Sequence, residues 1–147
     1  MSIAPIGRRC RLLRSPPVVL IVAGDQALLA MQAFGLLAMG FQPVVVQNAD
    51  DGFARACEFN PDVIVVDVDT VAASGWQLAH RLRSDTRTRN AGIIALTGND
   101  SGPATQQAAD VGFDRLLLKP CAPDSLALAI REVFAHRRLV TEAARSR

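Results

Sequence analysis

Five short apolar runs, each of strand length, alternate along this chain with longer segments of helical character. The runs are rich in valine, isoleucine and leucine and are continuous rather than alternating with polar residues. They occupy residues 18–22, 43–46 together with Gln42, 63–66, 93–96 and 116–118. Such runs indicate strands buried on both faces, as in a parallel sheet. Five βα units joined by right-handed crossovers then predict a three-layer α/β sandwich.

The segments between these runs carry helix start and stop signals. Gly40 and Gly112 are suited to helix C-termini, and Pro61 prevents a helix from continuing past Asn60. Ser74 is expected to cap the helix that follows the third run, and proline is tolerated at the start of the last helix. We therefore predict helices at residues 25–39, 49–59, 74–84, 103–111 and from 123 to beyond 136.

Length and composition limit the class of protein. The chain has 147 residues, 50% of them hydrophobic and 20% charged, which predicts one globular domain with a full core. Its formal net charge of +2 is too small to indicate nucleic acid binding by itself. Arginines crowd both ends of the chain, where solvated tails explain them better than contact with an anion. We expect a basic arm over residues 1–17, a folded domain over 18–138, and a tail or helix extension over 139–147.

Cysteine usage and the apolar segments bear on the compartment. Three cysteines with no paired spacing argue against a disulfide framework and favour reduced thiols in a cytoplasm. Basic residues before the run at 18–22 imitate a signal peptide, but Asp25 interrupts the apolar stretch early. The apolar segment that follows is short for a membrane span. We therefore expect a cytoplasmic protein with no membrane segment.

Polar side chains follow three of the predicted strands at one edge of the sheet. Asp67 and Asp69 come after the third run, Thr97 after the fourth, and Lys119 after the fifth. In open α/β sheets, ligands bind beyond the carboxyl ends of the strands. A carboxylate nucleophile can form an aspartyl-phosphate, while an ammonium and a hydroxyl hold the phosphoryl oxygens. The alternative is that these residues cap helices or lie on the surface without a chemical role. A carboxylate, a hydroxyl and an ammonium at one edge nevertheless favour a site that binds a phosphoryl group.

These residues carry a resemblance to the receiver domains of two-component response regulators, over residues 17–138. The segment 61–67, ending in Asp67, resembles the third strand with its phosphoacceptor, and Gly75 matches the glycine of the following loop. Residues 93–98 resemble the fourth strand with its hydroxyl, and 112–120 the fifth strand with its lysine and proline. The resemblance implies a flavodoxin-like sheet with strand order 2-1-3-4-5.

The resemblance also assigns roles to the site residues. Asp67 would accept phosphate from a histidine kinase or a phosphotransfer protein, and Thr97 and Lys119 would contact the phosphoryl oxygens. A magnesium ion (Mg2+) would bind Asp67 and the backbone carbonyl of Asp69. The acidic pair that holds this metal in the family is replaced by Ala23 and Gly24. Metal binding is therefore expected to be weak or absent, with Asp25, one place too late, or the Asp69 side chain as a doubtful substitute ligand.

Two further departures concern the response to phosphorylation. Leu116 stands where the family has an aromatic residue whose swing reports phosphorylation. The predicted loop after Asp67 also lacks the usual proline. Both the phosphorylation of Asp67 and the conformational response to it are thus expected to be impaired.

The segment 27–39 contains no charged residue, although a surface helix normally has a polar face. If Leu28, Met31, Gly35 and Ala38 face the sheet, apolar side chains must lie outside. We expect Leu29, Phe34 and Leu36 to form a surface for a partner protein or for a homodimer. Cover by the N-terminal arm is the alternative.

Three functions follow from these observations. The first is a stand-alone receiver module of a phosphorelay, not an enzyme, which acts through protein contacts and has no attached DNA-binding domain. The second is a pseudo-receiver that contacts another signalling protein without phosphorylation. The third is an aspartate-nucleophile phosphohydrolase using Asp67 and Asp69, although the chain has no glycine-rich phosphate loop.

Overall fold

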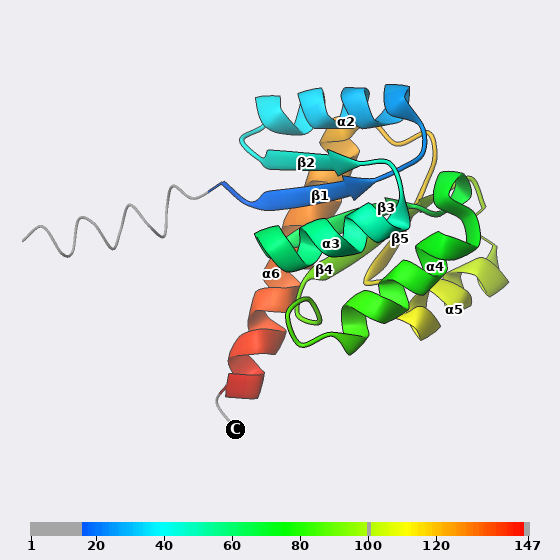
Figure 1. Cartoon of the computed structure of the whole chain (residues 1–147). Helices are drawn as coiled ribbons and strands as arrows, with labels where there is room; N and C mark the ends of the chain where they lie inside the picture. Colours follow the sequence, from blue (N-terminus) through cyan, green and yellow to red (C-terminus); the bar gives the residue numbers. More distant parts are fainter. Residues whose placement is uncertain (1–15, 100, 146–147) are drawn as a thin grey trace, which may run out of the picture.

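The computed structural model describes residues 16–99 and 101–145, with the backbone alone for residues 72–74. Most of the predicted basic arm and the last two residues lie outside this range. Five parallel strands form one sheet in the order β2-β1-β3-β4-β5, as the resemblance implies (Figure 1). The strands are β1 (Val18–Val22), β2 (Gln42–Val46), β3 (Val63–Asp67), β4 (Gly92–Thr97) and β5 (Arg115–Leu118). The helices are α2 (Gln26–Ala38), α3 (Ala49–Phe59), α4 (Val68–Ser84), α5 (Gly102–Val111) and α6 (Pro123–Arg145).

Two hydrophobic cores, one on each face of the sheet, make this a three-layer sandwich. Leu36 of α2 and Ile130 of α6 are fully buried in one core, together with side chains from β1, β3 and β4. Ala56 of α3, Leu78 of α4 and Ala108 of α5 lie in the other. Every residue of β3 and β4 is buried, whereas the edge strands β2 and β5 are partly exposed. The prediction of burial on both faces is therefore confirmed for β1, β3 and β4 but is wrong for β2 and β5, because an edge strand has a neighbouring strand on one side only.

Helix α4 begins six residues earlier than predicted. The Asp67 side chain is its N-cap and accepts hydrogen bonds from the backbone N–H groups of Asp69 and Thr70. Residues 68–73, expected as a loop, are thus the first turns of the helix, and the prediction of Ser74 as the N-cap is wrong. The physical reason is that an aspartate at a strand end satisfies the first free N–H groups as well as a serine does.

The predicted outer face of α2 is also wrong in part. Leu29 and Leu36 are 5% and 0% exposed and belong to the core, whereas Phe34 is 78% exposed, as expected. Leu37 accompanies Phe34 on the outside, and so does Met31, which is 48% exposed although the sequence pattern predicts it to face the sheet. Because α2 has no charged residue, its sequence contains no polar face that would indicate which side meets solvent.

Helix α6 is the long last helix that the sequence predicts, and it continues to Arg145. Its C-terminal part extends past the sheet (Figure 1). Near the amino end of β5, Asp114 accepts hydrogen bonds from Arg83 of α4 and Arg137 of α6. This ion-pair network ties helices from both faces together at the edge opposite Asp67. Within the described ranges, no helix is long and apolar enough to cross a membrane.

Candidate functional site

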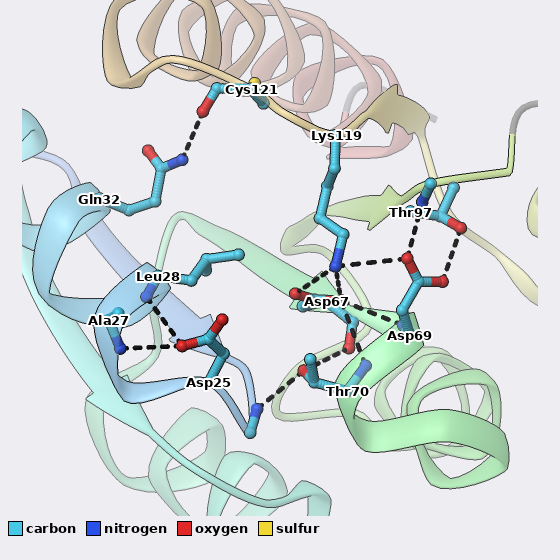
Figure 2. Close-up of polar contacts among 12 residues, drawn as sticks. Asp25, Ala27, Leu28, Gln32, Asp67, Asp69, Thr70, Thr97, Lys119 and Cys121 are labelled. Carbon is cyan, nitrogen blue, oxygen red and sulfur yellow. Dashed lines mark hydrogen bonds and ion pairs between the residues drawn. The ribbon is translucent and has the colours of Figure 1, made fainter.

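Asp67 and Lys119 meet at the carboxyl edge of the sheet, as the sequence predicts (Figure 2). The Asp67 side chain, at the end of β3, is 0% exposed. Lys119 follows β5, and its Nζ atom donates to both carboxylate oxygens of Asp67 at 3.0 Å. One of these oxygens also receives the capping N–H groups of α4. The carboxylate is therefore enclosed by donors on both oxygens.

Thr97 also reaches this edge, but its hydroxyl is directed to a different carboxylate. Its Oγ1 donates to Oδ1 of Asp69 at 2.8 Å, and the N–H of Gly98 donates to Oδ2 of Asp69 at 2.7 Å. Lys119 Nζ lies 3.3 Å from the same Oδ2. Asp69 therefore contributes its side chain to the site, whereas the resemblance assigns a role only to its backbone carbonyl.

The titration of these groups follows from the same contacts. Burial opposes ionisation of Asp69, but the N–H of Gly98, the hydroxyl of Thr97 and the ammonium of Lys119 outweigh it, so its pKa lies below 3.8. Burial likewise disfavours the charged form of Lys119, yet the carboxylates of Asp67 and Asp69 raise its pKa above 10.5. The contacts between them thus favour the charged forms of Asp69 and Lys119 at neutral pH.

Thr70 is a site residue that the sequence reasoning missed. Its hydroxyl donates to the backbone carbonyl of Asp67 at 3.3 Å and accepts the N–H of Gly24 at 2.8 Å. A Cβ atom on Gly24 would lie 3.0 Å from the backbone oxygen of Thr70, tighter than ordinary contacts. The first turn of α4 therefore sits directly against the end of β1. The only signal in the sequence was a threonine three residues after a potential capping aspartate.

The described side chains do not fit the magnesium site that the resemblance implies. Ala23 and Gly24 provide no side-chain oxygen, and Asp25 caps α2 by accepting the N–H groups of Ala27 and Leu28 at 2.9 and 3.3 Å. The carboxylate of Asp69 is already held by three donors. Among the residues described, no group of three or more histidine, cysteine, aspartate or glutamate side chains is arranged to hold a metal ion. Magnesium requires several oxygen ligands in octahedral geometry, which this edge does not assemble.

Leu116 on β5 is half-buried and packs against the core beneath α4 and α5. Gln32 of α2 is 1% exposed and donates its Nε2 to the backbone oxygen of Cys121 at 2.7 Å, so it ties α2 to the segment after Lys119. The sequence did not identify Gln32, because a lone glutamine in an apolar helix reads as a surface residue.

Comparison with known proteins gives the family. A family model for the response regulator receiver domain matches residues 19–131, and the chain belongs to this family. The phosphate regulon transcriptional regulatory protein PhoB of Pseudomonas aeruginosa is 30% identical over 116 residues, which cover 79% of this chain and 51% of PhoB. The DNA-binding dual master transcriptional regulator RpaA of Synechocystis is 28% identical over 132 residues, covering 88% and 54%. This chain thus spans about half the length of these relatives.

Solved structures agree on the fold. The chemotaxis response regulator CheY4 of Vibrio cholerae superposes with a TM-score of 0.76 at 24% identity, over 81% of this chain and 99% of that one. A CheY-like receiver domain protein of Methanospirillum hungatei gives the same score at 22% identity. At such identities the likeness establishes the flavodoxin-like architecture alone. The predicted family and fold are both confirmed.

Proposed function

We propose that this chain is a pseudo-receiver: a cytoplasmic two-component signalling module that acts through protein contacts, with Asp67 in a structural rather than a phosphate-accepting role. Its partner is a histidine kinase, a phosphotransfer protein or another signalling protein. The fold and the family support the assignment as a receiver domain, and the contacts of Asp67 support its structural role.

The observation that carries this proposal is the enclosure of Asp67. Both of its oxygens face the Lys119 ammonium, and one also caps α4. A nucleophilic carboxylate needs a free oxygen, and phosphoryl transfer needs cations that neutralise the negative charge of the transferred group. Here the single ammonium is already shared between two carboxylates, Asp67 and Asp69. Ala23 and Gly24 offer nothing to hold a further cation.

Contact with other proteins is supported by the outer face of α2. Met31, Phe34 and Leu37 are 48%, 78% and 61% exposed and lie within two turns of one helix. Gathered apolar side chains of this size commonly mark an interaction surface. We refer to Met31, Phe34 and Leu37 as the α2 patch.

Phosphorylation of Asp67 is the second candidate function. It is favoured by the convergence of Asp67, Thr97 and Lys119 on one edge, which the family uses to hold a phosphoryl group. In this case Lys119 would leave Asp67 for the incoming group, and Asp69 would release Thr97.

One experiment separates the two candidates. The full chain is incubated with acetyl phosphate, with and without magnesium, and its intact mass is measured beside that of Asp67→Asn. The proposal predicts no adduct on either protein at any magnesium concentration. An adduct that requires magnesium and disappears in Asp67→Asn would overturn it in favour of phosphorylation. Turnover of a generic phosphatase substrate, lost in Asp67→Asn, would instead point to the phosphohydrolase alternative.

A further inference from the structure

The carboxylate of Asp69 occupies an anion site built from three separate segments. Thr97 closes β4, Gly98 begins the loop that follows, and Lys119 comes after β5; each contributes one donor to the Asp69 oxygens (Figure 2). The Gly98 N–H lies 2.7 Å from its carboxylate oxygen, which is short for an N–H donor and typical of a charged acceptor, and the Thr97 hydroxyl makes an ordinary O–H···O bond of 2.8 Å. A hydroxyl, a backbone N–H and an ammonium that surround one carboxylate could bind other oxyanions in the same way.

We infer that Asp69 is a built-in anionic ligand of this site, which takes the place of an external oxyanion on Thr97, Gly98 and Lys119 and fixes them in one arrangement. This inference rests on the proposed function, in which the site is not loaded with phosphate. It adds the reason: the donors that would receive a phosphoryl group are occupied by the protein's own carboxylate.

The position of Asp69 depends on the early start of α4. Because Asp67 caps the helix, Asp69 lies in its first turn, and its N–H is bonded to Asp67 Oδ1 at 3.1 Å. An acidic residue in a first turn is ordinarily explained by attraction to the helix dipole. That explanation is incomplete here, because the side chain of Asp69 accepts hydrogen bonds from Thr97 and Gly98 at the end of β4. Its contacts join α4 to two strands.

The charges at this edge oppose a second anion. Asp67 and Asp69 are two carboxylates facing one ammonium, which leaves one negative charge in excess among the three groups. An external phosphate would have to displace Asp69 and approach Asp67 as well. Removing the Asp69 carboxylate would balance these charges, free the donors of Thr97 and Gly98, and leave Lys119 paired with Asp67 alone.

The same carboxylate orders the segment after β4. Thr97 Oγ1 donates to Asp69 and accepts the N–H of Asn99 at 3.1 Å. The Thr97 hydroxyl thus links Asp69 to the segment that connects β4 and α5. Loss of the built-in ligand should therefore be visible in the backbone at Gly98 and Asn99, away from the substituted residue.

The test uses the full chain labelled with ¹⁵N and follows the Gly98 amide by NMR while inorganic phosphate is added without magnesium. In the wild-type chain and in the control Asp110→Asn, which removes an exposed carboxylate on α5, this signal should not respond to phosphate. In Asp69→Ala the signal should shift upfield, and phosphate should return it saturably with an affinity about tenfold or more above that of wild type. Adding Lys119→Met to Asp69→Ala should abolish this binding.

Asp69→Asn is a second variant for the case that Asp69→Ala does not fold, because it keeps a side-chain oxygen for the Gly98 N–H. It should also gain phosphate binding, because the competing negative charge is gone. An unchanged Gly98 signal in both variants, or an equal response to phosphate in the wild-type chain, would overturn the inference. Because no phosphodonor is present, this result is independent of the acetyl phosphate experiment. A magnesium-dependent adduct in that experiment would overturn the proposed function instead.

Discussion

Lys119 Nζ lies 3.0 Å from each carboxylate oxygen of Asp67, and the Asp67 side chain is fully buried. Removing one member of a buried ion pair leaves the other charge without compensation, which costs about 3–5 kcal/mol. Lys119 is itself 24% exposed, so water screens part of this interaction. The pair should thus act as a structural element that joins β3 to the segment after β5.

The first prediction concerns this pair. Lys119→Met should lower the free energy of unfolding by about 3 kcal/mol, because the fully buried Asp67 carboxyl group then loses its ammonium partner. The double variant Asp67→Asn with Lys119→Met should lose less than the sum of the single variants, since neither charge then remains. Urea denaturation followed by circular dichroism measures all three differences. Strict additivity of the two substitutions would show that the ion pair has no structural role.

A second prediction follows from the lowered pKa of Asp69. A carboxyl group whose pKa is lower in the folded state contributes stability that is complete above its unfolded value, 3.8, and is lost as pH falls through the folded value. Asp69→Asn removes this contribution. The free energy of unfolding of the variant should therefore decline less than that of the wild-type chain as pH falls below about 4. Urea titrations across this range measure the two slopes, and parallel curves would contradict the assignment.

The strands could be predicted from the sequence, because continuous apolar runs of this length are typical of parallel sheets, and all five appear within two residues of their predicted bounds. The strand order came from the family resemblance, and the partial exposure of β2 and β5 follows from their places at the edges of the sheet. The start of α4 was not predictable in the same way, because Asp67 and Ser74 are both good N-caps and local preference does not choose between them. The choice depends on Lys119 and on the close approach of Gly24 to Thr70, which join residues far apart in the sequence.

The site likewise contains some residues that could be predicted from the sequence and some contacts that could not. Asp67, Thr97 and Lys119 were predictable because the carboxyl ends of parallel strands meet at one edge. The contacts of the Asp69 carboxylate with Thr97 and Gly98 were not predictable, since they depend on where α4 begins. The outer face of α2 was assigned incorrectly for Leu29 and Leu36, because packing against α6 and the sheet, rather than any charge in α2, decides its rotation.

A third prediction concerns the missing metal ligands. Gly24→Asp should not create a magnesium site, because its Cβ would press on the backbone oxygen of Thr70, which no substitution removes. The variant should instead lose about 1–3 kcal/mol of stability from overpacking. Thermal unfolding with and without millimolar magnesium tests this expectation. Stabilisation of Gly24→Asp by magnesium, but not of the wild-type chain, would show that the first turn of α4 can yield and that the family's metal site is recoverable.

The last prediction concerns the α2 patch. Phe34 is 78% exposed and Leu37 is 61% exposed, so replacing both with lysine leaves the core beneath α2 intact. Phe34→Lys with Leu37→Lys should therefore retain the thermal stability of the wild-type chain but lose its self-association or its binding to a partner protein. Leu139→Lys, at a residue 65% exposed on α6, is the matched control for adding charge at an exposed apolar position. Light scattering measures the mass of each protein over a range of concentrations, and pull-down with the purified partner measures binding. If the double variant and the control behave alike in both measurements, contacts of this module with other proteins do not pass through α2.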